Sequence, residues 1–288
     1  SILVAHWHTT IDLSGPKKNI DCRRDDFDAT AAEYRRLAEH GVVGIIDQTN
    51  RGMGRNVAYV QKMAAQAGVE ITHATGYYKE PFLPPECYTL TEQQLCDIMV
   101  KELTEGMEGT GVRATVIGEI GTSKDITETE AKVFRAASRA HAETGAPICT
   151  HTTLGTRGLE QLEIFKSFGV DLSRVVLSHI DLSADLDYMK RLLDQGVNIA
   201  FDTIGKCNYQ PDVSRADWLS RLCAEGYDTQ IVMSMDITRR SNFADRGGVG
   251  YSYLLDTFAP LASEAGVPDR AWENLLYRNA LRIYKGQK

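Results

Sequence analysis

Short apolar runs alternate along the chain with longer stretches in which apolar positions recur every three or four residues. The short runs have the length and the Val/Ile content of buried strands. Eight of them occur, at residues 2–6, 42–47, 69–75, 113–119, 146–151, 174–179, 197–202 and 230–236. The stretches between them, such as DATAAEYRRLAEHG at 28–41, are typical of amphipathic helices. The pattern therefore predicts eight strand–helix units.

Glycine follows several of the predicted helices, where a left-handed residue commonly ends a helix. These glycines are Gly41, Gly68, Gly145, Gly169, Gly196 and Gly226, and an apolar run begins within a few residues of each. Eight strands, each followed by a helix, in about 250 residues predict an α/β chain folded as a (β/α)8 TIM barrel. A doubly wound open sheet is the alternative, because the pattern does not show whether the sheet closes.

The domain organisation follows from what the sequence lacks. No linker, low-complexity segment or block of like charges divides it. We therefore expect a single domain over residues 1–288, with an additional terminal helix at about 268–285.

Charge and cysteine content narrow the classes of protein. The formal net charge of −7 argues against a general nucleic-acid binder, since such proteins are basic. No apolar run is long enough to span a bilayer, and the first residues, SILVAHWH, lack the pattern of a signal peptide. The six cysteines form no C-x-x-C pair, which predicts free thiols in a reducing compartment, with the cytoplasm as the expected location.

Histidines and carboxylates stand where several predicted strands end. They are His6 and His8 after the first run, Glu119 after the fourth, His151 after the fifth, His179 after the sixth and Asp236 after the eighth. In a barrel the carboxyl ends of the strands meet at the face that carries the active site. Residues i and i+2 of a strand share a side, so His6 and His8 can hold one ion together. Four imidazoles and two carboxylates exceed one tetrahedral site, and we therefore expect two divalent ions.

Glu119 interrupts the apolar stretch VIGEIGTS at 116–123. A buried carboxylate without a partner is costly, so Glu119 must either reach solvent or meet a cation. In a site with two ions it can meet both. We predict that Glu119 bridges the two ions.

Six motifs follow one another in a characteristic order: HWHTTIDLSG, VIGEIGTS, THTTLGTRGLEQL, LSHIDL, FDTIGK and MSMDITRRS. They resemble the phosphotriesterase family of the amidohydrolase superfamily and, within it, most closely the phosphotriesterase homology branch. The resemblance implies a hydrolase with a (β/α)8 barrel and two divalent ions, usually Zn²⁺, with Mn²⁺ or Co²⁺ as alternatives. It also implies the distribution of ligands: His6, His8 and Asp236 on the more buried ion, His151 and His179 on the more exposed ion, and Glu119 with a hydroxide between them.

Two positions depart from the better-studied members that the sequence resembles. Those members bridge the ions with a carboxylated lysine, whereas Glu119 is already an acid and needs no carbon dioxide. The members that degrade organophosphates carry a histidine after the Asp that ends strand seven, whereas Asp202 is followed here by Thr203. The path of a proton beyond Asp236 is therefore left open.

The chemistry expected of such a centre is hydrolysis. Two divalent cations lower the pKa of a bridging water and polarise the substrate oxygen. Asp236 is the predicted catalytic residue, since it is positioned to take the proton of the attacking hydroxide. The resemblance implies substrate contacts from Tyr78, and from Lys206 and Arg239, which related sugar-phosphate lactonases use to hold a phosphate. The ordinary alternative for the two cations is a surface ion pair or plain solvation.

We therefore expect an enzyme that cleaves a small ester, with an anionic lactone or a sugar-phosphate lactone as the substrate. One alternative is a hydrolase of phosphotriesters or phosphodiesters. The other is a metal-containing binding protein without turnover, because fold resemblance alone does not name a reaction. The expected partner is a small molecule rather than a nucleic acid or a membrane, and the resemblance allows a homodimer.

Overall fold

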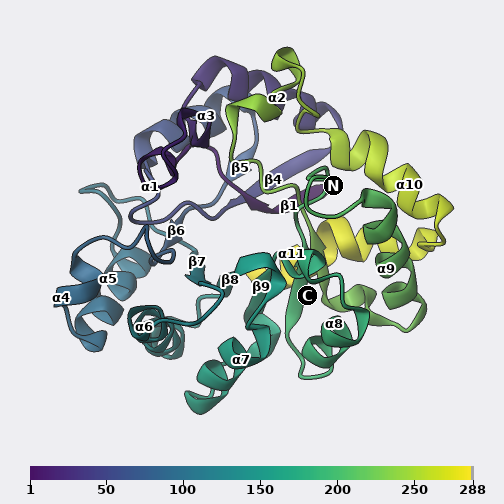
Figure 1. Ribbon diagram of the computed structural model, residues 1–288. Helices are drawn as coiled ribbons and strands as arrows, with labels where there is room; N and C mark the ends of the chain where they lie inside the picture. The colour runs from purple at the N-terminus through teal and green to yellow at the C-terminus, as the bar shows by residue number, and fades with distance from the viewer. Residues whose placement is uncertain (287–288) are drawn as a thin grey trace.

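Parallel strands form a ring surrounded by helices in the computed structural model, which describes residues 1–286 (Figure 1). In spatial order the ring contains β1 (Ile2–Trp7), β4 (Val42–Asp47), β5 (Glu70–Ile71) with β6 (Ala74–Thr75), β7 (Val116–Thr122), β8 (Ile148–Thr152), β9 (Val175–Ser178), β10 (Asn198–Phe201) and β11 (Ile231–Met233). Every neighbouring pair is parallel, and β5 and β6 are two parts of one predicted strand. The hydroxyl of Ser234, just after β11, donates to the backbone oxygen of His6 in β1 and closes the ring. The barrel prediction is confirmed, and the open-sheet alternative is wrong.

Helices cover the outside of the ring. The long ones are α2 (Phe27–Glu39), α3 (Val57–Ala67), α5 (Glu92–Thr104), α6 (Glu128–Thr144), α7 (Gly158–Ser167), α8 (Leu186–Leu193) and α9 (Asp212–Ala224), and the short ones are α1 (Ser14–Lys17), α4 (Glu86–Thr89), α10 (Ala259–Glu264) and α11 (Asn279–Lys285). Thr91 and Thr127 begin α5 and α6 with a reciprocal capping box. All six glycines predicted to end helices have a positive φ. Among the described residues, no helix has the length and apolar content needed to cross a membrane.

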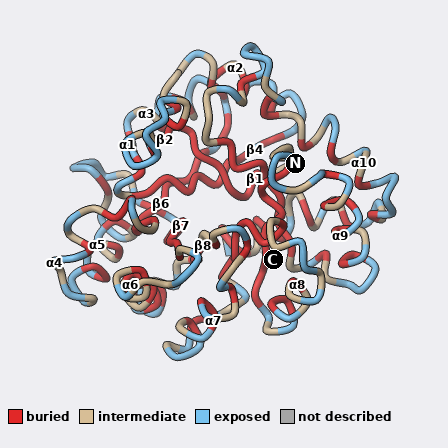
Figure 2. Tube along the Cα trace, in the orientation of Figure 1, coloured by how far each residue is buried: buried red, intermediate tan, exposed pale blue. Residues whose placement is uncertain are grey.

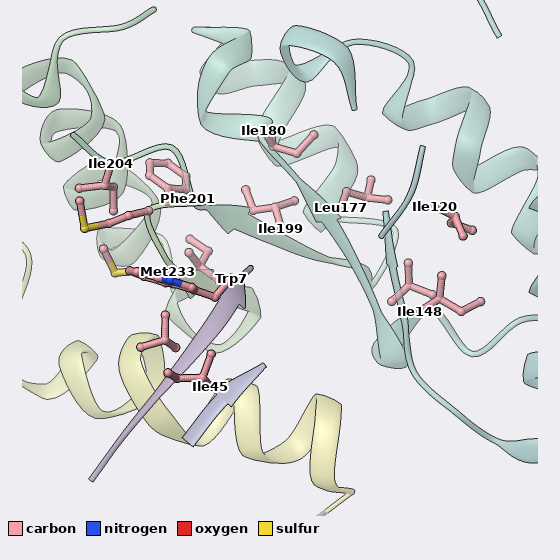
Figure 3. Close-up of a cluster of buried hydrophobic side chains, with 14 of the residues drawn as sticks. Trp7, Ile45, Ile120, Ile148, Leu177, Ile180, Ile199, Phe201, Ile204 and Met233 are labelled. Carbon is pink, nitrogen blue, oxygen red and sulfur yellow. The ribbon is translucent and has the colours of Figure 1, made fainter. Parts of the chain in front are cut away.

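Most residues of the barrel strands are buried, and Figure 2 shows red segments gathered in the middle of the molecule. Residues that point outward pack against the helices. Figure 3 shows part of this layer, which includes Trp7, Ile45, Ile148, Leu177, Ile199 and Phe201. Full burial of such a side chain stabilises the fold by roughly 1.5–3 kcal/mol.

The inside of the ring is filled at one end by small and branched side chains. These are Leu3, Ala5, Ile46, Ala74, Val116, Cys149, Val176, Ala200 and Val232, together with Ile283 and Tyr284 of α11. Arg282 of α11 donates to the backbone oxygens of Ser173 and Thr229, which precede β9 and β11. Helix α11 therefore covers the amino ends of the strands, and the carboxyl ends are left for a site.

Most strand boundaries differ from the prediction by a few residues, and the differences at β7 and β11 concern candidate site residues. β7 continues to Thr122, so Glu119 lies within this strand rather than at its end. The pairing of β7 with β8 shifts register between Ile117 and Ile120, and such an irregularity changes the direction of nearby side chains. β11 ends at Met233, so Asp236 stands in the loop beyond the strand. A short antiparallel hairpin of β2 (Ile11–Asp12) and β3 (Arg23–Arg24) was not predicted.

Candidate active site

His6 and His8 direct their Nε2 atoms at the same carboxylate. Oδ1 of Asp236 lies 3.3 Å from Nε2 of His6 and 3.2 Å from Nε2 of His8. Nδ1 of His8 is 2.8 Å from the hydroxyl of Thr49, and that hydroxyl donates its own proton to the backbone oxygen of Thr10. The hydroxyl of Thr49 therefore accepts from Nδ1–H of His8. In neutral His8 the lone pair of Nε2 then faces Asp236.

Glu119 lies between three imidazoles. Its Oε2 is 3.1 Å from Nε2 of His6 and 3.5 Å from Nε2 of His179, and its Oε1 is 3.6 Å from Nε2 of His8. Only 3% of the Glu119 side chain is exposed, so it does not obtain its partners from solvent. The carboxylate meets candidate cation ligands on both sides.

The glycine before Glu119 is required by a close approach of the backbone. A Cβ atom at Gly118 would lie 2.6 Å from Oε1 of Gln48 and 2.8 Å from the backbone oxygen of Cys149. Real Cβ atoms do not come this close, so any larger residue would displace β7. The side-chain amide of Asn50 also donates to the backbone oxygens of Gly118 and Glu119, at 3.1 and 2.8 Å. These contacts fix the position from which Glu119 extends.

Asp202 orients one of the imidazoles, His179, a role that we did not predict. Its Oδ1 accepts from the backbone N–H of His179 at 2.8 Å and lies 2.9 Å from Nδ1 of the same residue. Its Oδ2 lies 3.4 Å from Nδ1 of His6 without a hydrogen bond, because that nitrogen is paired with the hydroxyl of Ser178 at 3.0 Å. A carboxylate only accepts, so Nδ1 of His179 donates and Nε2 faces Glu119. Asp202 is the last residue of the predicted strand 197–202, so it occupies a strand end as the predicted ligands do.

His151 lies beside the other histidines but is oriented differently. Its ring centroid is 4.8 Å from that of His179. Its Nδ1 lies 3.2 Å from the hydroxyl of Tyr78, and its Nε2 lies 3.2 Å from the hydroxyl of Thr153. Burial and the charge of His179 hold the pKa of His151 well below its usual value, so the ring is neutral at neutral pH. His151 would therefore give up one of these two contacts to bind an ion.

The pKa values of His6, Glu119 and Asp236 are each shifted by the charges of their neighbours. Burial lowers the pKa of His6, but Glu119 and Asp236 outweigh burial and raise this pKa well above its usual value. Burial raises the pKa of Glu119, yet His6 and His179 hold it well below the usual range. Burial likewise raises the pKa of Asp236, whereas Lys206 and the histidines hold it well below the usual range. Both carboxylates are therefore ionised at neutral pH.

Two sets of ligand atoms meet the requirements of cation sites. The ligand atoms of His6, Glu119 and His179 lie within 4.8 Å of one another, and so do those of His6, His8 and Asp236. Four of these atoms are buried and have no hydrogen-bond partner in the described part of the chain: Nε2 of His6, Nε2 of His8, Oε2 of Glu119 and Oδ1 of Asp236. Imidazole lone pairs and carboxylate oxygens that face one another repel unless a cation or a proton lies between them. The two sets share Nε2 of His6, and neither includes His151. The donor atoms present therefore fit a divalent-cation centre.

A cavity of about 490 Å³ opens above these residues. Tyr78, Lys206 and Arg239, the three predicted substrate contacts, all line it. Nζ of Lys206 lies 2.9 Å from Oδ2 of Asp236, so this lysine adjoins the expected reaction centre. Arg239 forms no ion pair with any residue in 1–286, although its neighbour Arg240 pairs with Asp25 at 2.9 Å. Arg239 is thus available to a ligand.

The family model of the Phosphotriesterase family matches residues 2–284. The chain belongs to the phosphotriesterase family. It is 42% identical over 283 residues to the phosphotriesterase homology protein of Escherichia coli, and the match covers 98% of this chain and 97% of that protein. The crystal structure of the same E. coli protein, with phosphate in its active site, matches with a TM-score of 0.96 and covers 98% of both chains.

More distant relatives have other substrates in their names. The N-acetyltaurine hydrolase of Danio rerio is 31% identical over 269 residues, which cover 89% of this chain and 77% of that protein. A lactonase from Listeria monocytogenes is 27% identical, matches with a TM-score of 0.93 and covers 100% of this chain and 95% of its own. The family is one of metal-dependent hydrolases with two ions. This chain is therefore an enzyme of that class, and the alternative of a binding protein without turnover is set aside.

Proposed function

We propose that this enzyme hydrolyses a small anionic ester, a lactone or a sugar-phosphate lactone, at a centre of two divalent cations. The observation that carries the proposal is the meeting of four unpartnered, buried ligand atoms, of which those of Glu119 and Asp236 belong to residues that line the cavity. Two of them come from imidazoles and two from ionised carboxylates. Such a set suits Zn²⁺, which is the ion that we propose.

The six predicted residues would divide between two ions, and His151 would have to leave Tyr78 or Thr153 to take part. His6, His8 and Asp236 would hold the more buried ion, and their ligand atoms already lie together. His179 and His151 would hold the more exposed ion, and Glu119 would bridge the two. When bound, the ions would lower the pKa of a shared water and polarise the scissile carbonyl.

The chain's own residues would position the substrate and move the proton. Asp236 is ionised and lies at the cavity floor, so it can accept the proton of the attacking water. Burial and the charge of Glu119 raise the pKa of Tyr78 well above its usual value, so its hydroxyl keeps its proton and can donate to the substrate. Asp202 holds His179 in the required orientation.

Three relatives support a carbonyl substrate with an anionic group. One is named a lactonase. Another is named for N-acetyltaurine, which is a small amide with a sulfonate group. The E. coli relative binds phosphate in its active site. Arg239, with no ion pair in the described structure, and Lys206 supply the positive charge that such an anion requires.

The second candidate function is hydrolysis of a small anionic amide, which the N-acetyltaurine hydrolases favour.

A substrate panel with zinc-loaded protein tests the proposal. It should contain phosphorylated sugar lactones, neutral lactones, N-acetyltaurine, phosphodiesters and phosphotriesters. We expect the highest kcat/KM for an anionic lactone, or for N-acetyltaurine if the second candidate is correct. Faster turnover of a phosphotriester than of every carbonyl compound would contradict both candidates and favour a phosphoester hydrolase.

A further inference from the structure

Arg24 is a buried cation that lies apart from the candidate metal centre. It belongs to β3 and is 0% exposed, yet its guanidinium forms no ion pair within residues 1–286. Its Nη1 donates to the hydroxyl of Tyr251 at 2.6 Å and to the backbone oxygen of Thr9 at 3.5 Å. Its Nε and Nη2 have no hydrogen-bond partner in the same range of residues. A guanidinium has five N–H donors, so the three on Nε and Nη2 have no acceptor.

Two hydroxyl groups near Arg24 also have no partner among the described residues. They belong to Thr30 of α2 and Tyr59 of α3, and both oxygens are buried. Helices α2 and α3 pack side by side (Figure 1). Burial raises the pKa of Tyr59 to about 12 and also raises the pKa of Tyr251, whereas the charge of Arg24 and the hydroxyl of Thr30 oppose burial at both residues. These four side chains are therefore neighbours, and we refer to them as the Arg24 cluster.

Aromatic rings provide only part of the environment that the guanidinium requires. Its carbon lies 5.6 Å from the ring centroid of Tyr251 and 6.0 Å from that of Phe243. Both distances are near the outer limit of about 6 Å for a cation–π contact. An arginine side chain does not lose its proton inside a protein, so the positive charge remains.

The acidic residues closest to the Arg24 cluster already have other cations as partners. These ion pairs are Asp25 with Arg23 and Arg240, Asp26 with Arg246, and Glu33 with Arg36. The protein's own carboxylates therefore do not compensate the charge of Arg24. A buried charge without a counter-ion is costly, and bound water can complete hydrogen bonds but cannot remove the charge.

We propose that the Arg24 cluster binds a small monovalent anion, with chloride as the ligand. The anion would accept from Nε and Nη2 of Arg24 and from the hydroxyls of Thr30 and Tyr59. Thr30 stands in the first turn of α2, and the amino end of a helix favours negative charge. Tyr59 is only half-buried, so an anion can reach the cluster from its side.

The proposed anion site lies directly behind the segment that follows the candidate metal ligands of β1. Arg24 donates to the backbone of Thr9, which is next to His8, and the hydroxyl of Thr10 donates back to the backbone oxygen of Arg24 at 3.2 Å. A bound anion would thus hold this segment and the β2–β3 hairpin against α2 and α3. The inference is independent of the proposed function, because it involves neither the metal ligands nor the substrate cavity.

Anomalous diffraction tests the position of the anion. Crystals of the wild-type protein should be grown with bromide in place of chloride, because bromide has a measurable anomalous signal and similar chemistry. We expect an anomalous peak in contact with Nε or Nη2 of Arg24. Bromide peaks that occur only elsewhere, such as at the metal centre or on the surface, would overturn the inference.

Thermal unfolding tests the contribution of the anion in solution. The protein is compared in potassium chloride and in potassium gluconate at equal ionic strength, since gluconate is too large for a buried site of this kind. The variants are Arg24→Leu, which removes the charge, and Tyr59→Phe, which removes one hydroxyl. Arg23→Leu is the matched control, because Arg23 adjoins Arg24 but is 50% exposed and pairs with Asp25.

We expect chloride to raise the unfolding midpoint of the wild type and of Arg23→Leu by about 2–4 °C, as binding to the folded state requires. Tyr59→Phe should need about tenfold more chloride for the same gain, because one hydrogen bond to the anion is lost. Arg24→Leu should show no gain. The inference is wrong if the wild type shows no gain, or if Arg24→Leu keeps it. If Arg24→Leu does not fold, an unchanged chloride dependence in Tyr59→Phe contradicts the site.

Discussion

Two buried groups of charged side chains lie near the carboxyl ends of the strands, and they differ in how many of their polar atoms have partners. One surrounds Arg215, and the other is the candidate metal centre. Arg215, Asp181, His8 and Glu119 are all at most 3% exposed, so burial does not distinguish the groups. The hydrogen bonds do: around Arg215, Oδ1 of Asp181 lacks a partner in the described structure, whereas four atoms lack one in the candidate metal centre.

Arg215 has an acceptor for each of its five N–H groups. Its Nε lies 2.9 Å from Oδ2 of Asp181, and its other nitrogens donate to Oδ1 of Asp212, the hydroxyl of Thr203 and the backbone oxygens of Gln210 and Lys206. Thr203 in turn donates to Asp181 at 2.5 Å. Thr203 therefore belongs to this network, which also fixes the backbone of Lys206.

The candidate metal centre has the opposite character. Nε2 of His6 and of His8 and one oxygen each of Glu119 and Asp236 have no hydrogen-bond partner within residues 1–286. Buried polar atoms without hydrogen-bond partners lower the stability of the fold, unless a bound ion or ligand interacts with them. The comparison teaches that a buried charge with all its partners stabilises the fold, whereas converging charges without partners indicate a ligand.

Glu119→Gln should produce the largest effect. An amide cannot replace a charge shared by two cations, so metal is lost and kcat/KM falls by roughly a thousandfold, which corresponds to several kcal/mol of lost charge stabilisation. Elemental analysis and steady-state kinetics measure the two effects. Wild-type protein should regain full activity on addition of metal without bicarbonate, since Glu119 is itself an acid. A variant that keeps both ions, or a bicarbonate requirement, would show that the bridge lies elsewhere.

Arg215→Met tests the other half of the comparison. It leaves the carboxylates of Asp181 and Asp212 buried without their cation, which should lower the free energy of unfolding by about 3–5 kcal/mol. Metal content per folded chain should stay that of the wild type. Chemical denaturation and elemental analysis measure both. Arg157→Met is the control, because Arg157 pairs with Asp125 at 2.7 Å on the surface and its loss should not shift the transition. An unchanged unfolding curve for Arg215→Met would contradict the distinction.

Substitution of Lys206 and substitution of Arg239 should have different effects on charged and neutral esters. Arg239→Ala should weaken transition-state binding of an anionic ester by about 1.5–3 kcal/mol and leave a neutral ester unaffected. Lys206→Ala should slow both esters, because Lys206 lies 2.9 Å from Asp236. Steady-state kinetics of both variants on one charged and one neutral ester decide the matter. Equal losses for the two esters with Arg239→Ala would exclude its role in binding the anion.

The smallest effect concerns an exposed pair, His40 and Asp256, whose side chains are 2.7 Å apart. The carbonyl of Arg36 and then Asp256 raise the pKa of His40 above 6.5. Because this pKa is higher in the folded state, the pair stabilises the fold fully below the unfolded pKa, and the contribution is lost as the pH rises through the folded pKa. His40→Gln should therefore lower the unfolding midpoint slightly at pH 6 and not at pH 9, two pH values on either side of the unperturbed pKa of about 6.5. A loss that is equal at both pH values would show that the residue acts through packing instead.

Much of the barrel and the site could be predicted, because the barrel follows from the periodicity of apolar residues and the site from the position of polar residues at the ends of strands. The apolar runs and the glycines after the helices marked the eight strands, and carboxyl ends of parallel strands meet at one face. His6, His8, Glu119, His179 and Asp236 therefore came together as expected. Their assignment to individual ions is still a prediction.

The features that were missed depend on contacts between distant segments. The hairpin of β2 and β3 has two residues per strand, too few to show a period of two. Lys206 reaches Asp236 only because the loop after β10 folds back, with Arg215 holding its backbone oxygen. Asp202 resembles the predicted ligands in the sequence, and only its hydrogen bonds to His179 reveal its orienting role.

Metal content is the most direct test of the central claim, that six residues at one end of the barrel hold two divalent ions. Protein purified without chelator should contain close to two ions per chain, with zinc predominant, by elemental analysis. Anomalous diffraction should locate one ion among His6, His8 and Asp236 and the other beside His179, with Glu119 between them. Folded protein that was never exposed to chelator and contains no stoichiometric metal would contradict the account.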